Sequence, residues 1–280
     1  MTLPWGCYSG REITFATMHG KEQLAEPAFH EILGAAVTAP IGIDTDQFGT
    51  FAGDIPRTLS PRTAALAKAH LGMQLASTTL GLASEGSFSS GLWPVVENLE
   101  LVVFIDGDLG LEIVETTLGM SLLPSGGPVH ELAAALAFAK AVGFPHQGVI
   151  LQHVTDGISV ADKNHANFDE LERAVERLLE TSSSLAIMPD YRAHRAPSRA
   201  ETIRSLCTRM AHRLAVTCPR CDTPGFGRVE VEHGVACALC GLATTAIAAD
   251  VHGCGKCDHH QRVPRELTSV DPRWCDNCNP

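Results

Sequence analysis

The sequence predicts an α/β protein with a mixed sheet flanked by helices, followed by a small C-terminal module with two zinc ribbons. Two observations lead to this fold class. Strand-like and helix-like segments alternate through most of the chain, as in α/β domains. Eight of the ten cysteines lie between Cys218 and Cys278, all in Cys-x-x-Cys pairs. We therefore expect a larger domain over residues 1–214 and a zinc module over residues 215–280.

The elements of the larger domain are predicted from local signals. Ser60 and Pro61 suit the N-cap and first position of a helix, and Ser198 with Glu201 forms a capping box. A GDLG turn is expected between two β-strands. Strands are predicted at residues 13–18, 36–41, 78–83, 99–106, 111–116, 148–154 and 184–189, and helices at 21–33, 61–75, 129–142, 168–179 and 198–214.

The composition is that of a globular protein. Hydrophobic residues make up 45% of the 280 residues and charged residues 19%, so the chain can form a hydrophobic core. No stretch approaches the roughly 20 consecutive apolar residues of a membrane helix, and the N-terminus lacks a signal-peptide pattern. We expect a cytoplasmic protein with no membrane partner.

The net charge argues against nucleic acid as the main partner. The formal net charge is −11, and each Zn²⁺ bound by four thiolates would add about −2. Such a surface repels a polyanion over most of its area, so nucleic acid would require a local basic patch.

The cysteine pairs predict two structural zinc ions. A Cys-x-x-Cys turn presents both sulfurs on one side of a tight loop, and two such turns complete a closed tetrahedral site. The first two pairs flank a strand-like stretch, residues 228–232, which matches a zinc ribbon. Sequential pairing is the simplest assignment, and an interleaved cross-brace joining the first pair to the third is the alternative. The predicted ligands are Cys218, Cys221, Cys237, Cys240, Cys254, Cys257, Cys275 and Cys278.

Polar residues collect at the joints between the predicted elements of the larger domain. His19 and Lys21 lie at a helix N-terminus, where free backbone N–H groups favour a phosphate. Carboxylates close to Lys and Arg side chains suit a phosphate ester bridged by Mg²⁺. The other candidates follow strands or lie in glycine-punctuated loops: Asp44, Asp46, Thr50, Arg57, Glu85, Ser87, Arg192 and Arg199. We expect a small phosphorylated ligand at these joints.

Several motifs resemble those of a bacterial family catalogued as a domain of unknown function. They are ATMHGKE, DTDQFGTFAGD, ASEGSF, DYRAHRAPSR and the terminal CDNCNP, and they span nearly the whole chain. Asp54 stands where the family usually has Glu, and Ala196 stands where it has Asn. Neither position is therefore a catalytic candidate.

More distantly, the order of motifs is similar to that of the inosine/xanthosine triphosphate pyrophosphatases. This resemblance implies that Lys21 holds a triphosphate and that Asp46 and Glu85 bind metal, although no Glu stands two or three residues after Lys21 as in that family. The resulting hypothesis is a Mg²⁺-dependent hydrolase of a nucleotide or related phosphate compound, with His19 or Asp44 as the base. The alternative is a non-catalytic zinc-ribbon adaptor that binds nucleic acid or protein.

Overall fold

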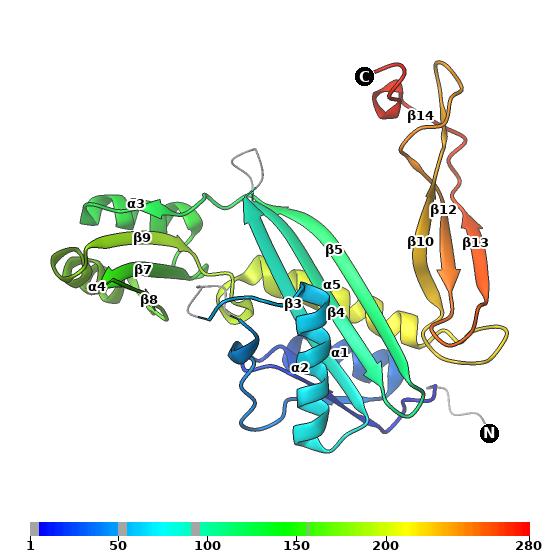
Figure 1. Ribbon diagram of the computed structural model, residues 1–280, viewed down its shortest axis with the longest axis horizontal. Coiled ribbons are helices and arrows are strands. Elements are labelled where there is room, and N and C mark those ends of the chain that lie inside the picture. Colours follow the sequence, from blue (N-terminus) through cyan, green and yellow to red (C-terminus); the bar gives the residue numbers. More distant parts are fainter. Residues whose placement is uncertain (1–5, 50–54, 91–95, 156) are drawn as a thin grey trace. The chain divides into compact units, whose positions relative to one another are not determined.

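A computed structural model describes residues 6–49, 55–90, 96–155 and 157–280 (Figure 1). The chain divides into two compact units. The larger unit is formed by Tyr8–Met210, and the smaller unit by Ala211–Pro280 together with the described residues Gly6 and Cys7. None of the helices in these ranges is long and apolar enough to cross a membrane.

The larger unit contains a twisted five-stranded sheet with the strand order β2-β1-β3-β4-β5 (Figure 1). Strand β1 runs parallel to β2 and β3, whereas the long β3-β4-β5 meander is antiparallel. The sheet is therefore mixed, as the sequence predicts. Its strands are β1 (Glu12–Phe15), β2 (Ala36–Thr38), β3 (Leu80–Ser90), β4 (Val96–Asp106) and β5 (Leu111–Ser121).

Local signals place the two helices that connect the first strands. Helix α1 (Glu22–Leu33) ends at Gly34, whose positive φ of 66° completes a left-handed C-cap. Helix α2 (Pro61–Ala76) begins at Ser60, whose Oγ accepts a hydrogen bond from the Thr63 N–H. Helix α2 packs its small buried residues against β3 and β4.

Helices α2 and α5 (Pro197–Leu214) lie on opposite faces of this sheet. Lys68 of α2 contacts Glu85, and Arg199 of α5 contacts Glu100. In the β3-β4 register Glu100 pairs with Gly86, the residue after Glu85. Because neighbouring strand residues point to opposite faces, Glu85 and Glu100 do so too.

The C-terminal half of the larger unit forms a second sheet in addition to the mixed sheet that the sequence predicts. It is antiparallel, with the order β6-β9-β7-β8, and helices α3 and α4 pack on it around a core of its own. Its elements are β6 (Gly127–Pro128), α3 (Leu132–Val142), β7 (Val149–Thr155), β8 (Ile158–Asp162), α4 (Phe168–Thr181) and β9 (Ser184–Pro189).

The predicted capping box at the start of α5 is wrong. The helix begins at Pro197, so Ser198 lies inside the first turn rather than at the N-cap. The Glu201 carboxylate pairs with Arg204 one turn later instead of folding back on the helix start.

The smaller unit consists of short strands. An antiparallel sheet has the order β10-β12-β13, and a separate parallel pair joins β11 to β14. The strands are β10 (Gly227–His233), β11 (Ala236–Cys237), β12 (Ile247–Gly253), β13 (His260–Pro264) and β14 (Ser269–Val270).

Candidate functional site

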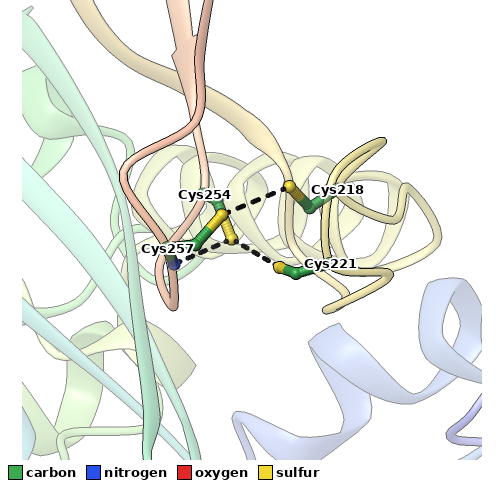
Figure 2. A group of neighbouring side chains, drawn as sticks. All are labelled: Cys218, Cys221, Cys254 and Cys257. Carbon is green, nitrogen blue, oxygen red and sulfur yellow. Dashed lines mark hydrogen bonds between the residues drawn. The ribbon is translucent and has the colours of Figure 1, made fainter.

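Eight cysteines of the smaller unit form two groups of four. One group joins Cys218 and Cys221 to Cys254 and Cys257 (Figure 2). The other joins Cys237 and Cys240 to Cys275 and Cys278. Within each group the sulfur atoms all lie within 4.8 Å of one another. The sequential pairing is therefore wrong, and the interleaved cross-brace is the arrangement found.

The length of strand β10 explains this pairing. The first cysteine pair precedes β10 and the second follows it, so a seven-residue strand of roughly 20 Å separates them. Strand β12 runs back along β10 and pairs Gly253 with Gly227, which returns Cys254 to the first pair. Strand β14 pairs Val270 with Cys237 and brings the last pair to the far end.

The sulfur spacing fits one Zn²⁺ in each group. Metal–sulfur bonds of about 2.3 Å give a regular tetrahedron with edges of about 3.8 Å. The distances are 3.8 Å for Cys218–Cys257 and 3.6 Å for Cys221–Cys254 in the first group, and 3.9 Å for Cys237–Cys278 and 3.6 Å for Cys240–Cys275 in the second. A disulfide would require about 2.05 Å. Four thiolates leave no position for substrate, so both sites suit structural zinc.

A separate pocket in the larger unit lies where β1 ends. Strand β1 pairs with β3 only at Gly81 and Leu82, so the later part of β3 has no strand pairing on that side among the described residues. Side chains from both sheets line the pocket, which has an empty volume of about 580 Å³ including the solvent at its mouth. This charged pocket is lined by His19, Lys21, Thr45, Asp46, Gly49, Arg57, Lys68, Glu85, Ile150, Lys163, Arg192 and Arg199.

The charged pocket is strongly cationic in an acidic chain. Six Lys and Arg side chains line it against two carboxylates, Asp46 and Glu85. Counting Glu100 and Asp190, which pair with Arg199 and Arg192, two positive charges remain in excess. The whole chain has a formal net charge of −11. The pocket is therefore suited to an anion.

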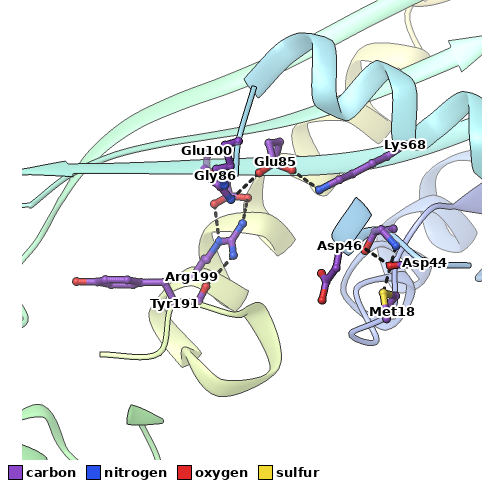
Figure 3. A network of polar contacts seen from close by, with 11 residues as sticks. Met18, Asp44, Asp46, Lys68, Glu85, Gly86, Glu100, Tyr191 and Arg199 are labelled. Atoms are coloured by element: carbon purple, nitrogen blue, oxygen red, sulfur yellow. Dashed lines mark hydrogen bonds and ion pairs between the residues drawn. The ribbon is translucent and has the colours of Figure 1, made fainter. Parts of the chain in front are cut away.

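Glu85 is the centre of a buried ion cluster (Figure 3). Its Oε2 accepts a hydrogen bond from Lys68 Nζ at 2.5 Å, and its Oε1 accepts one from Arg57 Nη2 at 2.8 Å. Arg57 Nη1 also donates to the carbonyl oxygen of Gly86 in β3. Burial alone would raise the pKa of Glu85, but Lys68, Lys21 and Arg57 together lower it. Glu85 is therefore an anion that holds two cations at the pocket wall.

Lys21 differs from the other cations of the charged pocket. Its ammonium makes no hydrogen bond or ion pair with any residue that the structure describes. Burial, together with the nearby Arg199 charge, lowers the pKa of Lys21 to about 8, although Glu100 and Glu85 oppose this shift. The side chain is still mostly protonated at neutral pH, so it presents a positive charge without a bonded counter-ion.

His19 and Asp46 add a neutral and an anionic group. The His19 ring lies 4.6 Å from the His194 ring, centroid to centroid. Burial lowers the pKa of His19 to about 4, with help from His194 and Lys21, so the ring is neutral at physiological pH. The Asp46 carboxylate has no hydrogen-bond partner among the described residues.

The two arginines at the other side of the pocket are held by buried acids. Arg199 makes a bidentate ion pair with Glu100 at 2.7 and 3.0 Å and donates to the Tyr191 carbonyl oxygen at 2.7 Å. Arg192 contacts the fully buried Asp190 at 2.6 Å. These contacts fix both guanidinium groups before any ligand binds.

The charged pocket brings together many of the residues singled out in the sequence. His19, Lys21, Asp46, Arg57, Glu85, Arg192 and Arg199 all line it. Asp44 and Ser87 do not line it, and the exposed Asp44 instead accepts a hydrogen bond from the Asp46 N–H in a local turn. Thr50 and Asp54 lie outside the described residues.

Sequence reasoning missed Lys68 and Lys163. Lys68 had a usable signal, because it lies on the buried face of α2 with small residues at helical spacing: Ala64, Ala65, Ala69 and Gly72. A lysine on such a face requires a buried counter-ion. Lys163 follows β8, a strand that the sequence pattern does not predict.

A known protein family matches most of the chain. Residues 68–280 match the model of a family described as Domain of unknown function (DUF6671). The chain belongs to this family. The DUF6671 match includes Lys68, Glu85, Arg199 and all eight paired cysteines, whereas His19 and Lys21 precede it. This confirms the resemblance to a domain of unknown function that the motifs indicate.

No curated protein matches the chain. The comparisons therefore name no relative that supports the similarity of this DUF6671 member to the inosine/xanthosine triphosphate pyrophosphatases.

Proposed function

We propose that the charged pocket binds a small phosphorylated compound, such as a nucleotide, and that the protein hydrolyses it with Mg²⁺. The observation that carries this proposal is the excess of cations in the pocket of an acidic chain, with Lys21 lacking a bonded counter-ion among the described residues. A concave site of one charge sign in a chain of the other attracts ligands of opposite charge to that site alone.

Lys21 would be the main phosphate ligand. Its Nζ can donate to phosphate oxygens without breaking an ion pair, and a bound anion would favour its protonated form. Arg57 would contact a second phosphate oxygen, held in place by Glu85 and the Gly86 carbonyl oxygen. Arg192 and Lys163 extend the positive wall.

Asp46 is the carboxylate best suited to Mg²⁺. Magnesium in proteins is commonly held by one or two carboxylates together with substrate phosphate oxygens, and Asp46 has no partner among the described residues. Both oxygens of Glu85 are already bonded, so we assign Glu85 to positioning Lys68 and Arg57. When bound, Mg²⁺ would neutralise phosphate charge and supply an activated water.

His19 is a better base than Asp44. His19 lines the charged pocket, whereas Asp44 does not. The neutral imidazole of His19 can accept a proton, and its pKa of about 4 makes it a weak base in the ligand-free protein. Asp44 is exposed, and its carboxylate supports the turn that presents Asp46.

The test is a panel of nucleotides and other phosphate esters with Mg²⁺, followed by calorimetric binding and phosphate or pyrophosphate release. We expect at least one compound to be bound and turned over by the wild type, with Lys21→Met weakening binding at least tenfold. Lys140→Met, an exposed lysine on α3, is the matched control and should bind as the wild type does. Binding that is equal in Lys21→Met and the wild type would contradict the proposal.

The alternative, a zinc adaptor for nucleic acid, has weaker support. Residues 211–280 contain seven Lys and Arg against eight Asp and Glu side chains. Several of the basic groups are paired on the surface: Arg220 with Asp258, Arg262 with Glu232 and Arg265 with Asp250. Such neutralised pairs do not form the basic stripe that binds a phosphate backbone.

A further inference from the structure

A second pocket of the larger unit lies next to the charged pocket. Arg199 lines both pockets, so they meet at this side chain. This aromatic pocket has an empty volume of about 930 Å³ including solvent at its mouth. Its floor is a row of cross-strand neighbours on β3, β4 and β5, because Phe88 pairs with Asn98 and Asn98 with Gly119. Tyr191 and Arg199 form part of its wall.

The aromatic pocket offers a stacking surface. The Phe88 and Tyr191 rings are stacked with centroids 4.0 Å apart and an interplanar angle of 18°. Arg199 Cζ lies 5.7 Å from the Phe88 centroid. Phe88 therefore supports Tyr191 from one side, and Tyr191 is partly exposed within the pocket lining. Flat aromatic surfaces of this kind bind planar rings by stacking.

Asn98 supplies an unused polar group in the middle of the floor. Its Oδ1 is buried and has no hydrogen-bond partner among the described residues. Buried amide oxygens are normally bonded, so an orphan of this kind in a pocket can accept a hydrogen bond from a ligand donor. A carboxamide can accept from and donate to the edge of a nitrogen heterocycle.

Arg199 lies where the two pockets meet, and its side chain is held by groups of the protein. Its guanidinium donates to both oxygens of Glu100 and to the Tyr191 carbonyl oxygen. It is therefore held in place where the cationic lining of the charged pocket meets the aromatic lining of the second pocket. A ligand with an anionic end and a planar end would fit the charged pocket with one end and the aromatic pocket with the other.

We infer that the aromatic pocket binds the heterocyclic base of the ligand whose phosphates occupy the charged pocket, so that the ligand class is nucleotides. This inference rests on the proposed function, because it needs phosphate in the charged pocket. Asn98 would bond the edge of the base, and Tyr191 would stack on its face. Gly119 leaves the space for it, since a Cβ there would meet nothing within 4 Å.

The test compares nucleotides with a ligand that has phosphates but no base. Binding of ATP, GTP, CTP and UTP, each with Mg²⁺, is measured beside inorganic tripolyphosphate. The variants are Gly119→Leu, which fills the pocket without a backbone clash, and Asn98→Leu, which removes the amide. Gly127→Leu, another β-strand glycine with open space, is the control. Thermal unfolding checks that each variant is folded.

We expect at least one nucleotide to bind the wild type at least tenfold more tightly than tripolyphosphate. Gly119→Leu and Asn98→Leu should remove most of this advantage and leave tripolyphosphate affinity within about twofold, whereas Gly127→Leu should change neither. If Gly119→Leu or Asn98→Leu fails to fold, the remaining variant tests whether the preference for nucleotides depends on the aromatic pocket. Equal affinity of the wild type for nucleotides and tripolyphosphate would overturn the base pocket but keep the phosphate site. Binding of neither ligand would overturn both.

Discussion

Lys68 Nζ lies 2.5 Å from Glu85 Oε2, and both residues are almost fully buried. The pair joins helix α2 to strand β3, and Arg57 contacts the other carboxylate oxygen at 2.8 Å. A single buried acid therefore balances two cations at the edge of the charged pocket.

Removing this acid should destabilise the protein strongly. Glu85→Gln leaves Lys68 and Arg57 without their counter-ion, and breaking such a buried pair typically costs about 3–5 kcal/mol. Urea denaturation would measure the loss, and adding Lys68→Met to Glu85→Gln should recover part of it. Glu201→Gln, which removes an exposed pair with Arg204, is the control and should cost less than about 1 kcal/mol. If Glu85→Gln and Glu201→Gln lower the free energy of unfolding equally, the buried cluster does not stabilise the protein more than a surface ion pair does.

Lys21 should make the ligand-free protein less stable at neutral pH. Its folded-state pKa is about 8 against an ordinary value of 10.5. Between these values the unfolded chain holds the proton and the folded chain does not, so the free energy of unfolding rises with pH from about 8 to 10.5. Lys21→Met should therefore raise stability at pH 7 by about 1–3 kcal/mol.

The matching observation is that this gain disappears as the pH approaches 10.5. Denaturation of the wild type and Lys21→Met at pH 7 and pH 10 gives both values. If Lys21→Met is less stable than the wild type at pH 7, the Lys21 charge does not destabilise the ligand-free protein.

Gly86 should tolerate no side chain. A Cβ at this position would lie 2.5 Å from Glu100 Oε2 and 2.6 Å from Arg199 Nη2, in a buried bidentate pair. Gly86→Ala should therefore destabilise by about 1–3 kcal/mol, as overpacking does. Gly119→Ala, where a Cβ meets nothing within 4 Å, should cost little. Chemical denaturation of the two variants makes the comparison, and similar stabilities would be inconsistent with this packing.

Zinc content distinguishes the interleaved from the sequential pairing. The double variant Cys221→Ser/Cys254→Ser alters one group of the cross-brace, so one zinc per chain should remain of the two in the wild type. Cys221→Ser/Cys240→Ser alters both groups and should lose both ions. Sequential pairing predicts the reverse. Metal analysis of the purified variants decides between the two arrangements.

The cysteine pattern predicts the metal centres but not their pairing. Ligand type and spacing are local properties of a Cys-x-x-Cys turn, so they can be read from the sequence. Which turns meet depends on β12 returning along β10 and on β14 pairing with β11. These contacts join segments far apart in the chain, and the sequence pattern leaves them open.

For the fold and the charged pocket, too, the sequence predicts local features but not the contacts between distant segments. The strands predicted at residues 148–154 and 184–189 are present as β7 and β9, but their mutual antiparallel pairing, which forms the second sheet, is a tertiary property. His19, Lys21 and Glu85 are candidates because the strands predicted at residues 13–18 and 78–83 end shortly before them. Strand β3 extends to Ser90, so Glu85 lies within a strand rather than after one. Lys68 lies inside a helix, where only its place on the buried face distinguishes it from a surface lysine.

The most direct test of the central claim is the pH dependence of tripolyphosphate binding. If protonated Lys21, with a pKa of about 8, holds the phosphates, wild-type affinity should be about tenfold weaker at pH 9 than at pH 7. Lys21→Met should bind weakly at both values, with no such change. Tight binding to Lys21→Met, or no binding to the wild type at either pH, would contradict a phosphate site in the charged pocket.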